Sequence, residues 1–178
     1  ARIKKPVTEA ALTMALSRRQ KSTKKKGPAK PRQFRLGNLG IHPDLTILTF
    51  EKTREGHRAV NLVYQRLQKT GGYLTLTEGM NEITLIIDSA NAALAGESFP
   101  AKPLFRSARI ACVWMKFDEQ YLSTPGFLFD ILQQFALQGI NVIELASTTT
   151  ELLVYLDRKD TRLAFDTLYS AYVEPFRG

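Results

Sequence analysis

The chain has 178 residues, 44% of them hydrophobic and 24% charged, which is the composition of a globular protein with a hydrophobic core. Its 25 Lys and Arg residues outnumber 17 Asp and Glu residues, so the formal net charge is +8 and a polyanion such as nucleic acid is the first partner to consider. One cysteine and two histidines exclude an internal disulfide framework and a Cys/His zinc site, and no apolar stretch suits a membrane span or a signal peptide, so we expect a cytoplasmic protein.

The positive charge is concentrated near the N-terminus. Residues 1–36 hold 12 Lys and Arg residues and one acidic residue, a net charge of +11, whereas residues 37–178 hold 13 basic and 16 acidic residues, a net charge of −3. Within this basic arm, residues 8–19 predict a short helix with Thr8 as its N-cap. Residues 20–36 predict a linker or a β-wing, because Lys, Gly and Pro leave little to bury.

The arm admits two interpretations. Its basic side chains can contact the phosphates of DNA or RNA, with binding that is weak and strongly salt-dependent. The arm can equally be a solvated tether. Under the first interpretation, the candidate contacts are Arg18, Arg19, Lys24, Lys25, Lys26 and Lys30.

The first half of the body predicts the order strand, helix, strand, strand. Residues 44–51 alternate Thr with large apolar residues and predict a strand. A helix follows and ends at Gly71-Gly72, because apolar residues recur at helical spacing at Val60, Val63, Tyr64 and Leu67. Residues 73–78 and 83–87 predict a hairpin, and residues 89–103 a helical turn with a proline-bounded loop.

The second half repeats this order. Residues 110–115 predict a buried strand and residues 118–123 a loop. Thr124-Pro125 predicts the start of a helix, with Thr124 as the N-cap and Pro125 at the first helical position, and Gly139 predicts its end. The buried stripe of this helix is expected to be Leu128, Ile131, Leu132 and Phe135.

Two strands, 141–147 and 151–156, and a last helix capped by Asp160 or Thr161 complete the second half. The order β-α-β-β-α therefore occurs twice, which predicts an α+β fold of two ferredoxin-like units, each an antiparallel sheet with helices on one face.

A complete ferredoxin-like unit needs a fourth strand, whereas the sequence shows six good strands in all and a candidate seventh at 34–41. The missing strands must be shared between the units, exchanged in an interlocked pair, or supplied by a partner chain. The predicted division is the arm with its helix at 1–36, a first unit at 37–104 and a second unit at 105–178.

Residues 110–165 carry a family resemblance. The stretch TPGFLFDILQQFALQGINVIELASTTTELLVYLD, followed by DTRLAFDTL, resembles an ACT domain, most closely the regulatory half of aspartokinases. The matching elements are the Pro-Gly helix start at 124–128, the Gly-Ile-Asn-Val at 139–142 and the Ser-Thr turn at 147–149. The whole layout is also similar to small archaeal-type predicted regulators of amino-acid metabolism.

The resemblance implies a dimeric, non-catalytic module that binds a small ligand, usually an amino acid, at an interface between two ACT units. Ligands in this family lie between the loop after the first strand and the start of the second strand of a paired unit. Carried onto this chain, these positions are Tyr121, Thr124, Gly126, Phe127, Leu128, Asn141, Val142 and Ile143.

The residue types suit such a ligand. The N–H groups at a helix start near 124–128 can receive a carboxylate, Gly126 allows close approach to the backbone, and Asn141 can hold an α-amino group. The alternatives without a ligand are an ordinary helix start, an Asn141 that caps the end of the helix, and an empty site kept for dimerisation. Lysine-sensing relatives can place a carboxylate where this chain has Ile143, and strict alternation would turn Glu144 to the opposite face, so we expect an apolar rather than a cationic amino acid.

Nothing in the sequence predicts catalysis, a metal or a cofactor, because no nucleophile or zinc motif is present and the carboxylates have no base placed beside them. His42 and His57 are expected at the surface, His42 in a turn, Cys112 as a buried inert thiol, and Trp114 in the core or an interface. The favoured function is therefore an amino-acid-binding regulator of amino-acid metabolism. The alternative is a nucleic-acid-associated, transcriptional regulator that uses the basic arm, with the ACT body as its dimerisation or sensor module.

Overall fold

The computed structural model describes residues 34–173. The predicted N-terminal helix, residues 20–33 of the predicted linker and the six basic nucleic-acid candidates lie outside the described residues. At the end of that linker the prediction is wrong, because Phe34 and Leu36 are buried and Leu36 begins a strand. Residues 35–173 belong to one compact body, which is described below by itself.

The body is built on one antiparallel sheet of six strands in the order β2-β3-β1-β4-β6-β5. Its strands are β1 (Leu36–Glu51), β2 (Leu74–Glu78), β3 (Glu82–Asp88), β4 (Phe105–Phe117), β5 (Val142–Ser147) and β6 (Glu151–Asp157). The α-helices are α2 (Arg54–Thr70), α3 (Ala92–Ser98), α4 (Phe127–Leu137) and α5 (Thr161–Leu168). Short helical turns are η1 (Ser89–Asn91), η2 (Glu119–Ser123), η3 (Arg158–Asp160) and η4 (Tyr169–Val173).

Two long strands, β1 and β4, belong to both ferredoxin-like units. The later part of β1 pairs with β3 and with residues 105–110 of β4, whereas residues 36–42 pair with residues 112–117 of β4, which in turn pairs with β6. Each long strand is thus the first strand of one unit and the fourth strand of the other. The structure answers the missing-strand question with shared strands, and the linear boundary at 104/105 stays a prediction.

Both long strands bend where they pass from one unit to the other. Asp44 on β1 and Arg109 on β4 have left-handed backbones, with φ of 65° and 63°. Such φ values are uncommon for residues other than glycine. Here they lie next to the Leu45–Ile110 pair, and the register between β1 and β4 shifts on both sides of this pair. The predicted strands at 34–41 and 44–51 are therefore one bent strand, β1.

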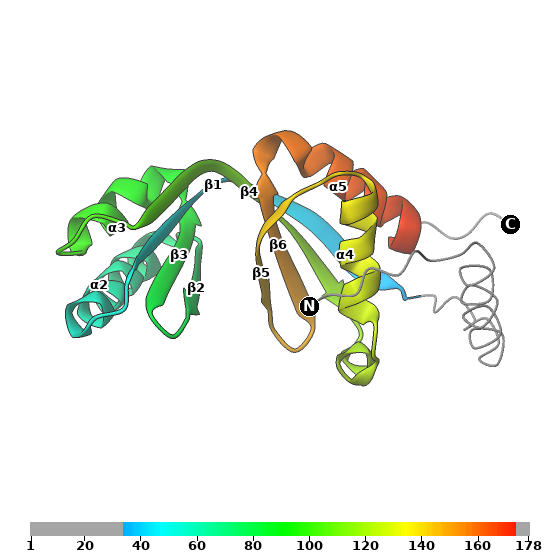
Figure 1. Ribbon diagram of the computed structural model, residues 1–178, viewed down its shortest axis with the longest axis horizontal. Coiled ribbons are helices and arrows are strands. Elements are labelled where there is room, and N and C mark those ends of the chain that lie inside the picture. Colours follow the sequence, from blue (N-terminus) through cyan, green and yellow to red (C-terminus); the bar gives the residue numbers. More distant parts are fainter. Residues whose placement is uncertain (1–33, 174–178) are drawn as a thin grey trace, which may run out of the picture. The chain divides into compact units, whose positions relative to one another are not determined.

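Helices α2 and α3 lie beside β1–β3, and α4 and α5 lie beside β4–β6 (Figure 1). The helices of each unit bury side chains in the interior of that unit. In the first unit, α2 buries the predicted Val60, Val63 and Leu67 against the sheet. In the second unit, α4 buries Phe127, Ile131 and Phe135, and Leu128 of the predicted stripe is instead exposed. A further cluster lies on the other face of the sheet and comes from strands and Tyr73, with Leu45, Ile47, Ile86, Ile110, Cys112 and Tyr155 at its centre.

Several local predictions are confirmed. Helix α2 ends at Gly71 and α4 is followed by Gly139, both with positive φ, and β2 and β3 form the predicted hairpin. Asp160 holds the N-cap position of α5 without a side-chain capping bond. The loop predicted at 118–123 contains the 3-10 turn η2.

Candidate functional site

The link between β4 and α4 is a tight turn whose polar side chains bond within the turn. Asp118 accepts a hydrogen bond from the Gln120 amide at 3.0 Å, and the Thr124 hydroxyl donates to the Gln120 carbonyl at 2.9 Å. Thr124 therefore closes η2 and does not cap α4. The prediction of Thr124 as the N-cap and Pro125 as the first helical residue is wrong, since α4 begins at Phe127.

Gly126 is the N-cap of α4, with φ of 97° and no side-chain capping bond. The first hydrogen bond of the helix runs from the Asp130 amide to the Gly126 carbonyl at 2.9 Å. An L side chain would meet no atom within 4 Å here, but the positive φ would strain it. The helix start thus carries the positive end of the dipole without a capping side chain, which suits a carboxylate.

Aromatic side chains pack together next to this turn. Phe127 is only 4% exposed, and its ring centre lies 4.9 Å from that of Phe117 and 5.2 Å from that of Tyr121. The Tyr121 hydroxyl accepts a hydrogen bond from the Arg35 amide at 3.0 Å. Leu128, in contrast, is 45% exposed at the first turn of the helix.

Asn141, Val142 and Ile143 lie at the other end of α4. Asn141 is exposed just before the edge strand β5, and Val142 and Ile143 are half-buried. The last turn of α4 is closed by backbone amides, including Ile140, whose N–H donates to the Phe135 carbonyl at 3.0 Å. The end of the helix therefore has backbone partners without Asn141 as a cap.

The predicted site residues form two groups that one chain cannot bring together. Helix α4 has 11 residues and so spans about 16 Å between Gly126 and the segment that leads to Asn141. A free amino acid cannot bridge that distance. Both groups belong to the second unit, so they can share a ligand only if each comes from a different copy of that unit, at an interface of the kind that the resemblance implies.

The bulge at Ile143 alters the expected side-chain directions. Val142 is opposite Leu156 and Glu144 is opposite Tyr155, so Ile143 is an extra residue in β5. Ile143 also packs against the cluster that contains Tyr155. Strict alternation therefore fails here, and the register does not separate Glu144 from Ile143 by face. The alternation of side chains therefore no longer supports an apolar over a cationic ligand.

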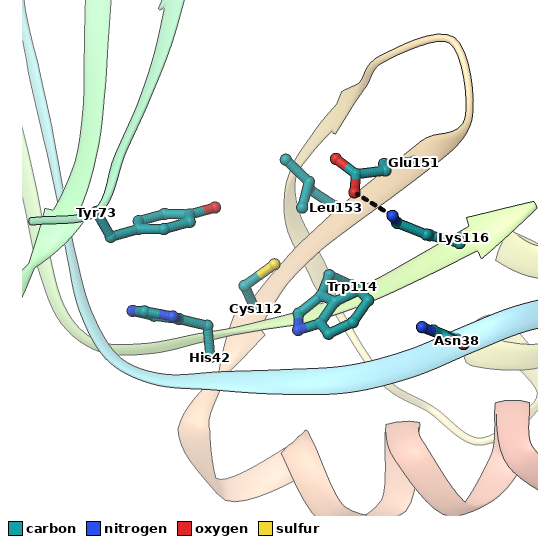
Figure 2. A pocket seen from close by; sticks show the side chains of 8 residues that line it. All are labelled: Asn38, His42, Tyr73, Cys112, Trp114, Lys116, Glu151 and Leu153. Atoms are coloured by element: carbon teal, nitrogen blue, oxygen red, sulfur yellow. Dashed lines mark ion pairs between the residues drawn. The ribbon is translucent and has the colours of Figure 1, made fainter. Parts of the chain in front are cut away.

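A second concave feature lies on the helix-free face of the sheet (Figure 2). We call it the sheet cavity, and its volume is about 350 Å³. Alternate residues of β1, β4 and β6 line it together with Tyr73, namely Asn38, His42, Tyr73, Cys112, Trp114, Lys116, Glu151 and Leu153.

Sequence reasoning missed this cavity because it treated its residues one at a time. His42 lies in β1 and not in a turn, with Nε2 2.9 Å from Asp88 Oδ1 and its ring stacked on Tyr73 at 4.5 Å. Cys112 is buried as predicted, and burial raises the pKa of its thiol to about 12. Trp114 is half-buried on the floor of the cavity.

Three hydroxyl groups join the two units beside the cavity. The Tyr73 and Tyr155 hydroxyls lie 2.6 Å apart, and Thr75 Oγ1 lies 2.6 Å from the Tyr155 hydroxyl and 3.0 Å from that of Tyr73. Burial raises the pKa of both tyrosines, so the network is uncharged at neutral pH. We call this set the hydroxyl network.

Among residues 34–173, no group of three or more His, Cys, Asp or Glu side chains is placed to hold a metal ion. No helix in the same range is long and apolar enough to span a membrane.

Comparisons with known proteins give structural matches only. No family model matches the sequence, and no curated protein sequence matches it significantly. The fold is similar to the regulatory subunit of aspartate kinase from Thermus thermophilus, with a TM-score of 0.61 and 16% identity over 79% of this chain and 99% of that one.

Whole aspartate kinases match over a smaller share of their length. Clostridium acetobutylicum aspartate kinase gives a TM-score of 0.64 at 14% identity, over 78% of this chain and 35% of that enzyme. E. coli aspartokinase III in complex with lysine and aspartate gives 0.59 at 16% identity, over 82% and 34%. The chain thus has the fold of the aspartate kinase regulatory portion and spans about a third of the whole enzymes. None of these comparisons supports a nucleic-acid partner.

Proposed function

We propose that this chain is a non-catalytic regulatory protein that binds a free amino acid between two ferredoxin-like units and thereby regulates amino-acid metabolism. The observation that carries the proposal is the pair of units joined by shared strands, a fold that matches an aspartate kinase regulatory subunit over 99% of its length. One structural neighbour, E. coli aspartokinase III, was crystallised with lysine and aspartate, which supports an amino acid as the ligand class.

In the proposed site, the ligand carboxylate lies at the N-terminus of α4 beside Gly126. Its α-amino group bonds to Asn141 and the start of β5 in a second copy of the chain. The separation of about 16 Å along α4 argues for this second copy, because one chain cannot supply both halves. A two-fold dimer would form two such sites, each with one half from each subunit.

A ligand screen tests the proposal. The full chain is heated with each of the twenty amino acids in turn, and unfolding is followed by fluorescence. An amino acid present at 100 times its Kd should stabilise the protein by about 2.7 kcal/mol. The same screen decides between apolar and cationic ligands, because Glu144 would favour lysine or arginine if it faces the site. A chain that no amino acid stabilises would overturn the proposal.

A matched pair of variants locates the site. Gly126→Asp adds a negative charge where the carboxylate should lie, and Gly71→Asp adds the same charge at the end of α2, in the first unit and away from both halves of the proposed site. Both glycines have positive φ and open space for a side chain, so both variants carry similar backbone strain. Binding should be lost in the first and kept in the second.

A further inference from the structure

The sheet cavity is formed by three strands in register. Paired residues on neighbouring antiparallel strands face the same side, so the pairing places three rows of side chains on one surface. The rows are Gly40, Trp114 and Leu153, then His42, Cys112 and Tyr155, then Lys116 and Glu151. Trp114 and Leu153 thus form the middle of the cavity. We call the end formed by the rings of His42 and Tyr73 the wall, and the end formed by Lys116 and Glu151 the rim.

The Trp114 indole forms a flat apolar floor because Gly40 leaves room for it. A Cβ atom at residue 40 would lie 2.5 Å from the indole ring, closer than any side chain tolerates. The indole therefore lies across the backbone of Gly40 and is half-buried. A planar ligand can stack on its remaining face.

Hydrogen bonds hold both rings of the wall, His42 and Tyr73, in place. Asp88 bonds to His42 at 2.9 Å and accepts from the Tyr73 amide at 2.7 Å, which fixes the stacked pair of rings. The Tyr73 hydroxyl is held in the hydroxyl network with Tyr155. Figure 2 shows the rings of His42 and Tyr73 at one end of the cavity. The wall is therefore formed before any ligand arrives.

The rim at the other end carries one charge of each sign. Lys116 Nζ and Glu151 Oε1 lie 3.8 Å apart, and their side chains are 53% and 40% exposed. At that separation the two groups attract each other without a hydrogen bond, so each keeps its bonding capacity. A zwitterion can place its carboxylate at Lys116 and its ammonium group at Glu151.

We propose that the sheet cavity binds a free aromatic amino acid, with its ring on Trp114 and Leu153 and its zwitterionic head between Lys116 and Glu151. A volume of about 350 Å³ falls within the range of about 300 to 1,000 Å³ that is usual for small-molecule sites. This site is separate from the start of α4 and is complete within one chain. It therefore stands or falls independently of the proposed interface site.

The test uses the fluorescence of Trp114, which is the single tryptophan of the chain. L-phenylalanine is titrated into the full chain while tryptophan alone is excited. We expect a saturable change in emission. 2-Phenylethylamine and 3-phenylpropionate each lack one charge of the head group, so each should bind about three to ten times more weakly.

Two rim variants and one matched control locate the effect. Lys116→Gln and Glu151→Gln remove one exposed charge each, and each should weaken the binding of L-phenylalanine about two- to fivefold. Glu78→Gln, which removes one partner of the exposed pair with Lys52 in the first unit, should leave the affinity unchanged. Trp114→Ala, followed by calorimetry, should abolish binding, and the rim variants keep the test decisive if Trp114→Ala fails to fold.

Gly126→Asp separates this proposal from the interface site. An unchanged L-phenylalanine affinity in Gly126→Asp, with weaker binding in Lys116→Gln, supports the sheet cavity even if the interface proposal fails. No saturable change, binding of both one-charge analogues as tight as that of L-phenylalanine, or a loss in Gly126→Asp with full binding in Lys116→Gln would each overturn it.

Discussion

The two ferredoxin-like units share their strand order and two of their strands, yet they begin their first helices in opposite ways. In the first unit, β1 passes to α2 through two residues, and Thr53 caps the helix by accepting a hydrogen bond from the Gly56 amide at 2.9 Å. In the second unit, residues 118–126 intervene, and α4 begins at Phe127, with Gly126 as an N-cap that has no side chain to accept a bond.

This difference is the reason for placing the proposed ligand at the second helix start. The first helix start has a side-chain acceptor of its own, whereas the second presents the positive end of the dipole behind a longer turn. The second helix start is also where the sequence resembles an ACT domain. We therefore assign the proposed interface site to the second unit and a structural role to the helix start of the first.

The largest expected effect tests whether the shared strands make the units unfold together. Phe135→Ala in α4 should cost about 3–5 kcal/mol and Leu67→Ala in α2 about 2–5 kcal/mol, because both side chains are buried. Since β1 and β4 belong to both units, each variant should move one common transition in urea. Two separate transitions, with only one moved by each variant, would contradict the shared-strand account.

A second effect concerns the hydroxyl network between the units. The pKa of Tyr155 is raised by burial, so the folded state favours its neutral hydroxyl. Its contribution is complete below the unfolded pKa of about 10 and is lost as the pH rises above that value. Stability should therefore fall above pH 10, and less steeply in Tyr155→Phe. Tyr169→Phe, at an exposed position, is the control, and identical slopes in all three proteins would refute the role of the network.

The smallest effect compares the two threonines at the helix starts. Thr53→Ala removes a capping bond and should cost about 1 kcal/mol. Thr124→Ala removes a hydroxyl that bonds to the Gln120 carbonyl within η2, so the loss should stay within about 0.5 kcal/mol. Midpoints of urea unfolding measure both. Equal losses would mean that Thr124 caps α4 in solution.

The sequence predicted the features that depend on local signals. Helical spacing and the terminal glycines located α2 and α4, and alternation located the β2–β3 hairpin. Thr124 misled the prediction because a Thr-Pro pair is a common helix start, whereas the positive φ of Gly126 moves the start two residues on. A single sequence carries no sign of that backbone conformation.

Features that depend on distant residues could not be predicted. Whether β1 serves both units depends on where β3 and β4 pair with it, and these strands are distant in the sequence. The bulge at Ile143 likewise depends on how β5 pairs with β6. The sheet cavity joins Tyr73 to strands of the other unit, and its partner Tyr155 is 82 residues away. Alternation showed which residues share a face of one strand, and the register between strands was needed to assemble that face.

The central claim is that each amino-acid site combines Gly126 of one subunit with Asn141 of another. Calorimetry on a mixture of refolded Gly126→Asp and Asn141→Ala chains tests it most directly, with the non-aromatic amino acid that stabilises the wild-type chain most, because an aromatic one could also bind in the sheet cavity. Each variant alone should not bind. In a two-fold dimer, half of the mixed dimers are heterodimers with one intact site each, so about a quarter of the wild-type binding capacity should return at the wild-type affinity. A mixture that regains no binding would contradict the account.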